Sequence, residues 1–230
     1  MHLDGGMLPR FLLALYVVVG ALDVIGQAAS LDPLVVATKP LLVPLLVAWL
    51  VATARRQAVS GPLAWLLAGL GFAWLGDLAL MAGGDLFFAL GLVVFLVMQA
   101  CYIVAFTRVP GPGLVRAWKV AIVPFAAFWA GMNLLVWPGA GSMRIPVLVY
   151  SAVLLAMAAA ALDLVLRVPR PLGWRVFWGA ALFVVSDSLI AVTAFGPLEP
   201  SPGPSAAVMS TYIAAQALIV TGFTRAVATR

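Results

Sequence analysis

The chain has little of the chemistry on which many soluble enzymes depend. Its 230 residues include one cysteine, Cys101, and one histidine, His2. A single cysteine excludes a disulfide framework and a CxxC redox pair, and the scarcity of both residue types excludes a Cys/His zinc site and a histidine-dependent catalytic triad. Any catalysis must therefore use carboxylates, hydroxyls, amides, lysine or arginine.

Charged residues are also scarce, at 9% of the chain, whereas 65% of the residues are hydrophobic. Both values lie far outside the averages of soluble domains. The net charge of +5 comes from Lys and Arg residues that stand between apolar runs rather than on one soluble face, so nucleic acid is not an expected partner. The composition predicts an integral membrane protein that is embedded in the lipid bilayer.

Proline, glycine and charged residues divide the sequence into eight apolar stretches, each near the roughly 20 residues that a membrane-spanning helix needs. The expected spans are 10–29, 33–54, 62–82, 86–107, 114–137, 145–166, 174–195 and 205–227. Almost nothing remains for a soluble domain, so we expect an all-α bundle of eight transmembrane helices that forms a single domain over residues 1–230. The longest connections are 108–116 and 196–204, and the second contains too much proline to continue either flanking helix.

The distribution of Lys and Arg predicts the orientation of the bundle. Eleven of the 13 basic residues lie on one side: Arg10, Arg55, Arg56, Arg108, Arg116, Lys119, Arg167, Arg170, Arg175, Arg225 and Arg230. Because basic loops stay in the cytoplasm, both termini are expected to be cytoplasmic, in a multi-pass protein of the inner (plasma) membrane. An alternative treats the first span as a signal peptide that is cleaved near residues 26–28, but Asp23 interrupts its apolar region.

Four ionisable residues lie inside the expected spans: Asp23, Lys39, Asp77 and Asp187. Each costs roughly 2.5–3.5 kcal/mol at a helix centre, so they must meet one another or water. A rise of 1.5 Å per residue places all four about 20 Å above the cytoplasmic ends of their helices. A second polar set falls about 16–26 Å above those ends: Asn133, Tyr150, Tyr212 and Gln216. This convergence predicts a polar cavity that opens to the non-cytoplasmic side.

The spacing of polar residues within single spans places several of them on a common helical face. Residues that share a helical face are Tyr16, Asp23 and Gln27 in the first span, Gln99 and Tyr102 in the fourth, and Tyr212 and Gln216 in the last. Pro40 and Pro44 follow Lys39 closely. A proline inside a helix leaves a carbonyl unpaired and kinks the helix, which suits a segment that lines a cavity.

Several of these residues also have structural interpretations. Asp23 and Lys39 could form an ion pair near the outer interface. Tyr150 and Tyr212 could belong to the interfacial aromatic belt.

Other polar residues have structural interpretations as well. Asp85 and Asp163 lie at span boundaries, where solvation is expected. Ser186 and Ser188 could bond to the preceding helical turn, and no histidine is present to activate either as a nucleophile.

Asp77 and Asp187 are the strongest functional candidates, because each lies in an apolar stretch and neither has a cationic neighbour in its own helix. If Asp23 shares their layer, three carboxyl groups face only Lys39. Repulsion and poor solvation then prevent all three from ionising together. At least one is expected to be protonated while another is charged, which supplies an acid and a base without histidine.

Five motifs stand in order from the second span to the last: Lys39–Leu45 (KPLLVPL), Phe72–Leu78 (FAWLGDL), Phe88–Phe95 (FALGLVVF) followed by Gln99–Tyr102 (QACY), Gly179–Leu189 (GAALFVVSDSL) and Tyr212–Leu218 (YIAAQAL). Together they resemble the YhhN, or lysoplasmalogenase, family of integral membrane proteins. The resemblance covers nearly the whole chain. One departure is Gln99, which stands where a histidine is common in the family.

The resemblance implies hydrolysis of the vinyl ether bond of lysoplasmalogens, a class of lysophospholipid, to a fatty aldehyde and a glycerophospho-ethanolamine or -choline. Such cleavage needs an acid, a base and negative charge near an oxocarbenium ion, and two carboxylates meet the same needs in glycoside hydrolysis. We therefore expect Asp77 and Asp187 to form the acid/base pair. No cofactor and no metal ion is expected. The expected substrate-binding residues are Lys39, Asp23, Asn133, Tyr150, Tyr212, Gln216, Gln99, Tyr102 and Ser186.

Two other functions compete with this one. A non-enzymatic carrier or binder of an amphipathic small molecule would also use a buried Asp/Lys cluster, although the sequence shows no inverted repeat. A metal-dependent membrane hydrolase of the ceramidase kind would need several histidines inside the membrane, and the expected spans contain none. The sequence specifies neither the head group nor the oligomeric state.

Overall fold

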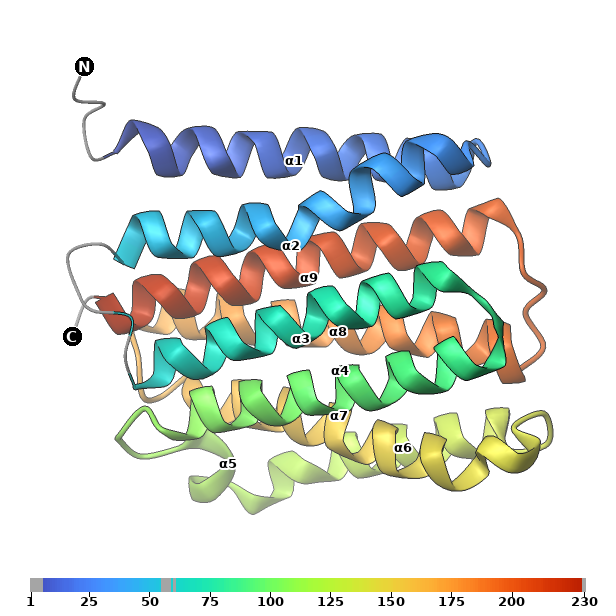
Figure 1. Cartoon of the computed structure of the whole chain (residues 1–230). Coiled ribbons are helices and arrows are strands. Elements are labelled where there is room, and N and C mark those ends of the chain that lie inside the picture. The colour runs from blue at the N-terminus through green and yellow to red at the C-terminus, as the bar shows by residue number, and fades with distance from the viewer. Residues whose placement is uncertain (1–5, 55–58, 60, 229–230) are drawn as a thin grey trace.

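The computed structural model describes residues 6–54, 59 and 61–228. It shows a bundle of long helices whose axes run in roughly the same direction (Figure 1). Eight segments are long and apolar enough to cross a membrane. Six are single helices: α1 (Met7–Ala28), α2 (Asp32–Ala54), α3 (Pro62–Ala82), α4 (Gly84–Thr107), α8 (Arg170–Phe195) and α9 (Pro202–Ala228). The other two begin with a short 3-10 helix: η1 (Lys119–Ile122) before α6 (Val123–Val136), and η2 (Gly141–Met143) before α7 (Arg144–Leu164). No strand occurs in these residues, so the expected all-α bundle of eight spans is confirmed.

The core forms where helices that follow one another in the chain pack as antiparallel neighbours. The most extensive contacts join α1 to α2, α3 to α4 and α8 to α9. Small residues bring α3 and α4 close together, because a Cβ atom at Gly69 would lie 2.5 Å from the Tyr102 ring and one at Gly76 would lie 2.7 Å from the Phe95 ring. These glycines therefore set the positions of two aromatic side chains close to the polar interior.

Helix α2 bends along its length (Figure 1), and two internal prolines explain the bend. Pro44 has no N–H to donate to the carbonyl of Pro40, four residues earlier. The indole Nε1 of Trp74 on α3 donates to that carbonyl at 2.9 Å instead. The predicted kink beside Lys39 is therefore present, and a neighbouring helix satisfies the carbonyl that the proline leaves unpaired.

Two boundaries differ from the sequence-based expectation. The segment expected as one helix over 114–137 is broken into α5 (Leu114–Ala117), η1 and α6, because Trp118 has a non-helical backbone and Pro124 starts a new helix. The connection expected over 196–204 is shorter, because α9 already begins at Pro202 and includes Pro204. First-turn N–H groups have no acceptor within the helix, so prolines there remove no hydrogen bond.

The expectation that Asp163, near the end of α7, is solvated is wrong. It is buried rather than solvated, and its Oδ1 accepts hydrogen bonds from the backbone N–H groups of Val115 at 2.8 Å and Arg116 at 3.2 Å. Its other oxygen pairs with the guanidinium of Arg167, which is also buried. Burial lowers the pKa of Arg167, and the Asp163 carboxylate opposes that shift. Asp85 is exposed, as expected.

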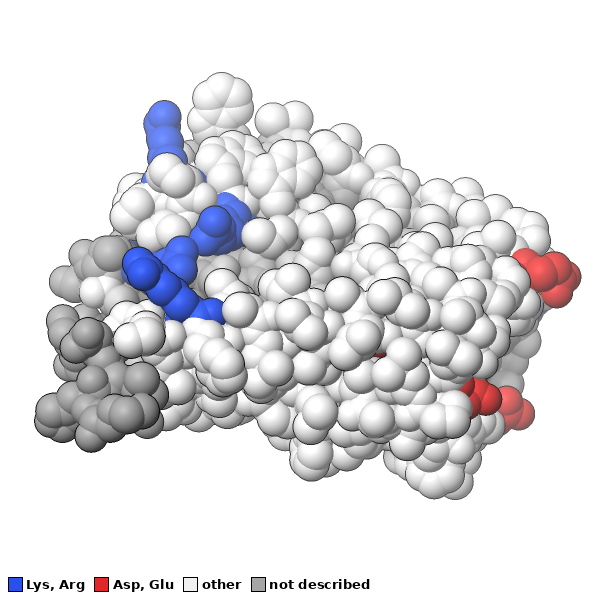
Figure 2. Space-filling model, turned by 90° about the horizontal axis from the view of Figure 1, so that it is seen from above, with Lys and Arg blue, Asp and Glu red and all other residues white. Residues whose placement is uncertain are grey.

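Charge is distributed asymmetrically along the bundle. Helix α1 begins and α9 ends at the same end of the molecule (Figure 1). On the face shown in Figure 2, Lys and Arg side chains gather toward that end, and Asp and Glu side chains lie at the other. Three of the basic residues used in the orientation argument, Arg55, Arg56 and Arg230, lie outside the described residues.

This asymmetry leads to a topology prediction. We expect the basic end, and with it both termini, to face the cytoplasm. Reporter fusions after Arg230 and in the connection 197–201 should therefore report opposite sides of the membrane. An external C-terminus would contradict this orientation.

Candidate active site

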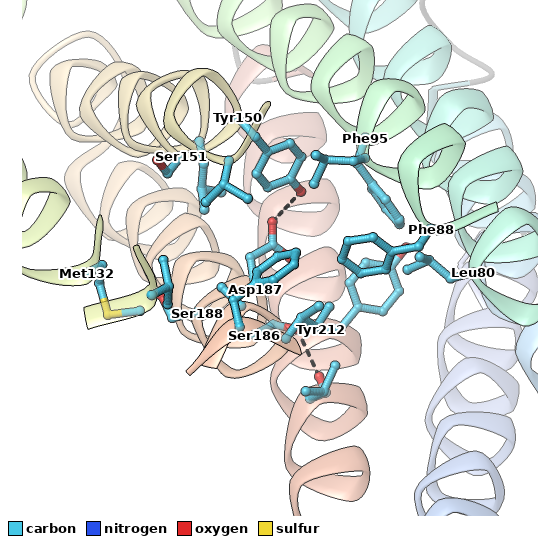
Figure 3. A pocket seen from close by; sticks show the side chains of 18 of the residues that line it. Leu80, Phe88, Phe95, Met132, Tyr150, Ser151, Ser186, Asp187, Ser188 and Tyr212 are labelled. Carbon is cyan, nitrogen blue, oxygen red and sulfur yellow. Dashed lines mark hydrogen bonds between the residues drawn. The ribbon is translucent and has the colours of Figure 1, made fainter. Parts of the chain in front are cut away.

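A cavity of about 1020 Å³, including the open space at its mouth, lies between α2, α3, α4, α6, α7, α8 and α9. Its wall is largely apolar (Figure 3). Seven of the residues singled out in the sequence line it: Lys39, Asp77, Asn133, Tyr150, Ser186, Asp187 and Tyr212. These polar residues, which the sequence places at similar depths in different helices, therefore line one shared cavity.

Asp187 lies on α8 and is held by a tyrosine of α7. The hydroxyl of Tyr150 donates to Asp187 Oδ2 at 2.5 Å, and Figure 3 shows this bond on the cavity wall. The adjacent Ser186 donates to the backbone carbonyl of Val208 on α9 at 3.0 Å, and not to the preceding turn of its own helix. Bonds to two other helices therefore fix this part of α8.

Asp77 lies on α3 and is held in the same way by α9. The hydroxyl of Tyr212 donates to Asp77 Oδ2 at 2.7 Å, and the two residues are 5% and 3% exposed. Behind this pair, Gln216 Nε2 donates to the Tyr212 hydroxyl at 3.4 Å, and the Tyr102 hydroxyl donates to Gln216 Oε1 at 2.8 Å. A buried chain of hydrogen bonds thus supports the carboxyl group of Asp77.

These bonds decide between two interpretations of the tyrosines. An aromatic belt would place Tyr150 and Tyr212 at the membrane surface. Both are buried, and the ring of Tyr212 makes edge contacts with Phe95 and Phe183. The belt interpretation is therefore wrong, and each tyrosine positions a carboxyl group.

Asp23 and Lys39 do not form the ion pair that the sequence allowed. Within the described residues no nitrogen–oxygen contact of 4.0 Å or less joins them. Asp23 is 0% exposed and accepts a hydrogen bond from the hydroxyl of Thr38 at 3.0 Å. Thr38 was missed because a helical threonine commonly bonds its own preceding turn, as this one also does to Leu34 at 2.7 Å.

Four of the expected substrate-binding residues do not line the cavity: Asp23, Gln99, Tyr102 and Gln216. Tyr102 and Gln216 support Tyr212 from behind, and Gln99 is fully buried on α4. The structure adds Ser151 to the wall, where its hydroxyl accepts from Asn133 Nδ2 at 3.1 Å. No spacing signal identified Ser151, because the other hydroxyl of α7 belongs to the adjacent Tyr150, and adjacent residues do not share a helical face.

A second hollow, which we call the vestibule, shares part of its wall with the cavity. The vestibule is lined by the polar residues Gln27, Lys39, Thr193 and Ser205 and by Leu80, Phe88, Ile190, Ala194, Pro200, Pro204, Val208 and Met209. Six of these residues, including Lys39, also line the main cavity. The vestibule adjoins the connection between α8 and α9, at the end of the bundle opposite to the basic one. That the cavity opens to the non-cytoplasmic side stays a prediction.

No group of three or more His, Cys, Asp or Glu side chains with the geometry of a metal site occurs in the part of the chain that the structure describes. The two cavity carboxyl groups each face a tyrosine hydroxyl. Metal independence stays a prediction, and the assay described below tests it.

The fold and the site together define a polytopic α-helical membrane protein in which two carboxyl groups, each hydrogen-bonded to a tyrosine, line one internal cavity. Residues 34–223 match the YhhN family, and the chain belongs to this family. All five motifs noted in the sequence lie inside the matched range. No curated protein and no solved structure matches the chain.

Proposed function

We propose that this protein is a membrane hydrolase that cleaves the vinyl ether bond of lysoplasmalogen-type lysophospholipids. The observation that carries the proposal is the pair Asp77 and Asp187, each bonded to a tyrosine of another helix on the wall of one mainly apolar cavity. An amphipathic lipid matches such a cavity, because its chain is apolar and its reacting bond lies next to its polar part. The family membership is compatible with this activity.

The reaction needs one carboxyl group protonated and one ionised. The protonated group gives its proton to the β-carbon of the vinyl ether, where the electron pair of the double bond forms the new C–H bond. The α-carbon and the ether oxygen then share the charge of an oxocarbenium ion, which the two aspartates stabilise. The ionised group removes a proton from water as the water oxygen attacks the α-carbon, which gives a hemiacetal.

Collapse of the hemiacetal restores both groups. The first carboxylate takes the proton of the hemiacetal hydroxyl, and the second carboxyl group gives its proton to the glycerol oxygen as the C–O bond breaks. The products are the fatty aldehyde and the glycerophospho head group, and each aspartate returns to its initial protonation state. The cycle therefore needs no histidine, metal or cofactor.

The remaining cavity residues would position the reactants. Tyr150 and Tyr212 each bond the Oδ2 atom of an aspartate, which leaves Oδ1 for substrate or water. Lys39 would attract the phosphate, and Asn133 and Ser186 provide polar groups on the same wall. The tyrosines thus fix the angle at which each carboxyl group approaches the vinyl ether.

The assay that tests this function compares three lipids in detergent micelles: a lysoplasmalogen, an ester lysolipid and a saturated ether analogue. We expect purified protein to release free aldehyde from the vinyl ether alone, with or without EDTA. Tight binding of all three lipids without aldehyde release would favour the alternative, a carrier or binder of amphipathic molecules. Loss of turnover in EDTA and its recovery with a divalent cation would contradict metal independence.

A further inference from the structure

Lys39 lies where the main cavity and the vestibule meet. It is half-buried on α2, beside the kink at Pro40, and it lines both hollows. Among the described residues that line either hollow it is the single cation. Asp77 lines the main cavity with it but does not line the vestibule. A ligand that spans both hollows must therefore pass one fixed positive charge.

The described wall of the vestibule has no group suited to an amine. A primary ammonium is bound by carboxylates, and a quaternary ammonium by a cage of several aromatic rings. The lining holds no Asp or Glu, and its other polar residues, Gln27, Thr193 and Ser205, are neutral. Its one aromatic residue, Phe88, makes an edge contact with Phe195 at 5.8 Å between ring centroids. The vestibule thus offers recognition for an anion and none for a cation.

Resting on the proposed function, we propose that the protein selects vinyl ether lysolipids by their phosphate, through Lys39, and does not distinguish what is attached to it. The ammonium of lysine binds phosphate as a point charge and demands no particular substituent. With the phosphate at Lys39, the glycerol leads inward and places the vinyl ether beside Asp77 and Asp187. The substituent beyond the phosphate lies in the open vestibule. Lysolipids that end in a bare phosphate, in phosphoethanolamine and in phosphocholine are therefore all substrates.

The test uses four vinyl ether lipids with the same chain: the phosphate, phosphoethanolamine and phosphocholine forms, and an alkenylglycerol without phosphate. For the wild-type protein we expect kcat/KM values for the three phosphate lipids within about threefold of one another. The neutral lipid should be slower by roughly tenfold or more, the usual loss when a charged hydrogen-bonding partner is removed. A tenfold preference for either amine-containing lipid over the bare phosphate would overturn the proposal.

Two substitutions at Lys39 test whether its positive charge is what recognises the phosphate. Lys39→Met should remove the advantage of the phosphate lipids over the neutral one, and Lys39→Arg should retain it. Glu199→Gln is the matched control, because Glu199 is exposed beside Pro200 but does not line the vestibule. It should leave the ratios among the head groups unchanged. A Lys39→Met protein that keeps the phosphate preference, or a Glu199→Gln protein that alters the amine preference, would contradict the assignment.

A binding assay separates this proposal from the hydrolase proposal. Saturated ether lysolipids with the same four head groups cannot be cleaved, so their dissociation constants test recognition alone. If the protein releases no aldehyde but binds the three phosphate lipids equally and the neutral one about tenfold more weakly, the hydrolase proposal fails and phosphate selection stands. Equal binding of the neutral lipid would overturn phosphate selection whatever the catalytic result.

Discussion

Replacing either Asp77 or Asp187 with asparagine is expected to lower the rate of aldehyde release by a factor on the order of a hundred or more. Asparagine has almost the same volume and still offers an oxygen to the tyrosine that each aspartate contacts. It cannot exchange a proton with the substrate or with water. The variants should therefore fold and bind lipid while the chemical step fails. The measurement is kcat in detergent, with the melting temperature of each variant as a check on folding.

Other carboxylate and lysine variants serve as controls for this prediction. Asp85→Asn alters an exposed carboxylate on α4 outside the cavity and should leave turnover unchanged. Asp23→Asn and Lys39→Met should weaken lipid binding or stability more than the chemical step. If Asp77→Asn and Asp187→Asn each keep near wild-type aldehyde release, the acid/base mechanism is wrong and the two buried carboxyl groups are structural.

The second large effect is expected far from the cavity, at Asp163. Its replacement by alanine removes the carboxylate that pairs with the buried Arg167 guanidinium and that accepts hydrogen bonds from two backbone N–H groups. Breaking a buried ion pair in this way commonly lowers the free energy of unfolding by about 3–5 kcal/mol. Denaturant unfolding in mixed micelles, followed by tryptophan fluorescence, measures the change.

Arg116→Gln is the matched control for Asp163. The Arg116 side chain is 72% exposed, and its Nε lies 3.9 Å from Asp163 Oδ2. An exposed pair of this kind contributes at most about 1 kcal/mol. Because Asp163 does not line the cavity, the folded fraction of the alanine variant should keep its specific activity. Equal losses of stability in the two variants would show that burial of the Asp163 pair is not what stabilises this end.

The common depth of the polar residues was predictable because helix rise is fixed. Counting residues from the cytoplasmic ends of the spans placed Lys39, Asp77, Tyr150, Asp187 and Tyr212 in one layer, and all five line one cavity. The spans themselves followed from the apolar runs, since a bilayer accepts little other than continuous helix.

Rotation about each helix axis was harder to predict, because a protein embedded in lipid has apolar residues on both its inner and its outer faces. Asp23 and Gln99 lie in largely apolar spans, and neither lines the cavity. Asp163 was misjudged for another reason. Its partners are backbone groups of a connection and an arginine beyond the helix end, and no helical period relates them.

The hydrogen bond between Tyr212 and Asp77 also imposes an order on the biosynthesis of the protein. Tyr212 is made 135 residues after Asp77, an interval on the order of ten seconds at ordinary rates of translation. Throughout that interval α3 must stay in or near the bilayer with a carboxyl group that has not met its tyrosine. Asp187, by contrast, leaves the ribosome after Tyr150 is already in place. A chain that stops before α9 keeps the Asp77 carboxyl group without its tyrosine, so the helix that is made last is also the one that completes the site.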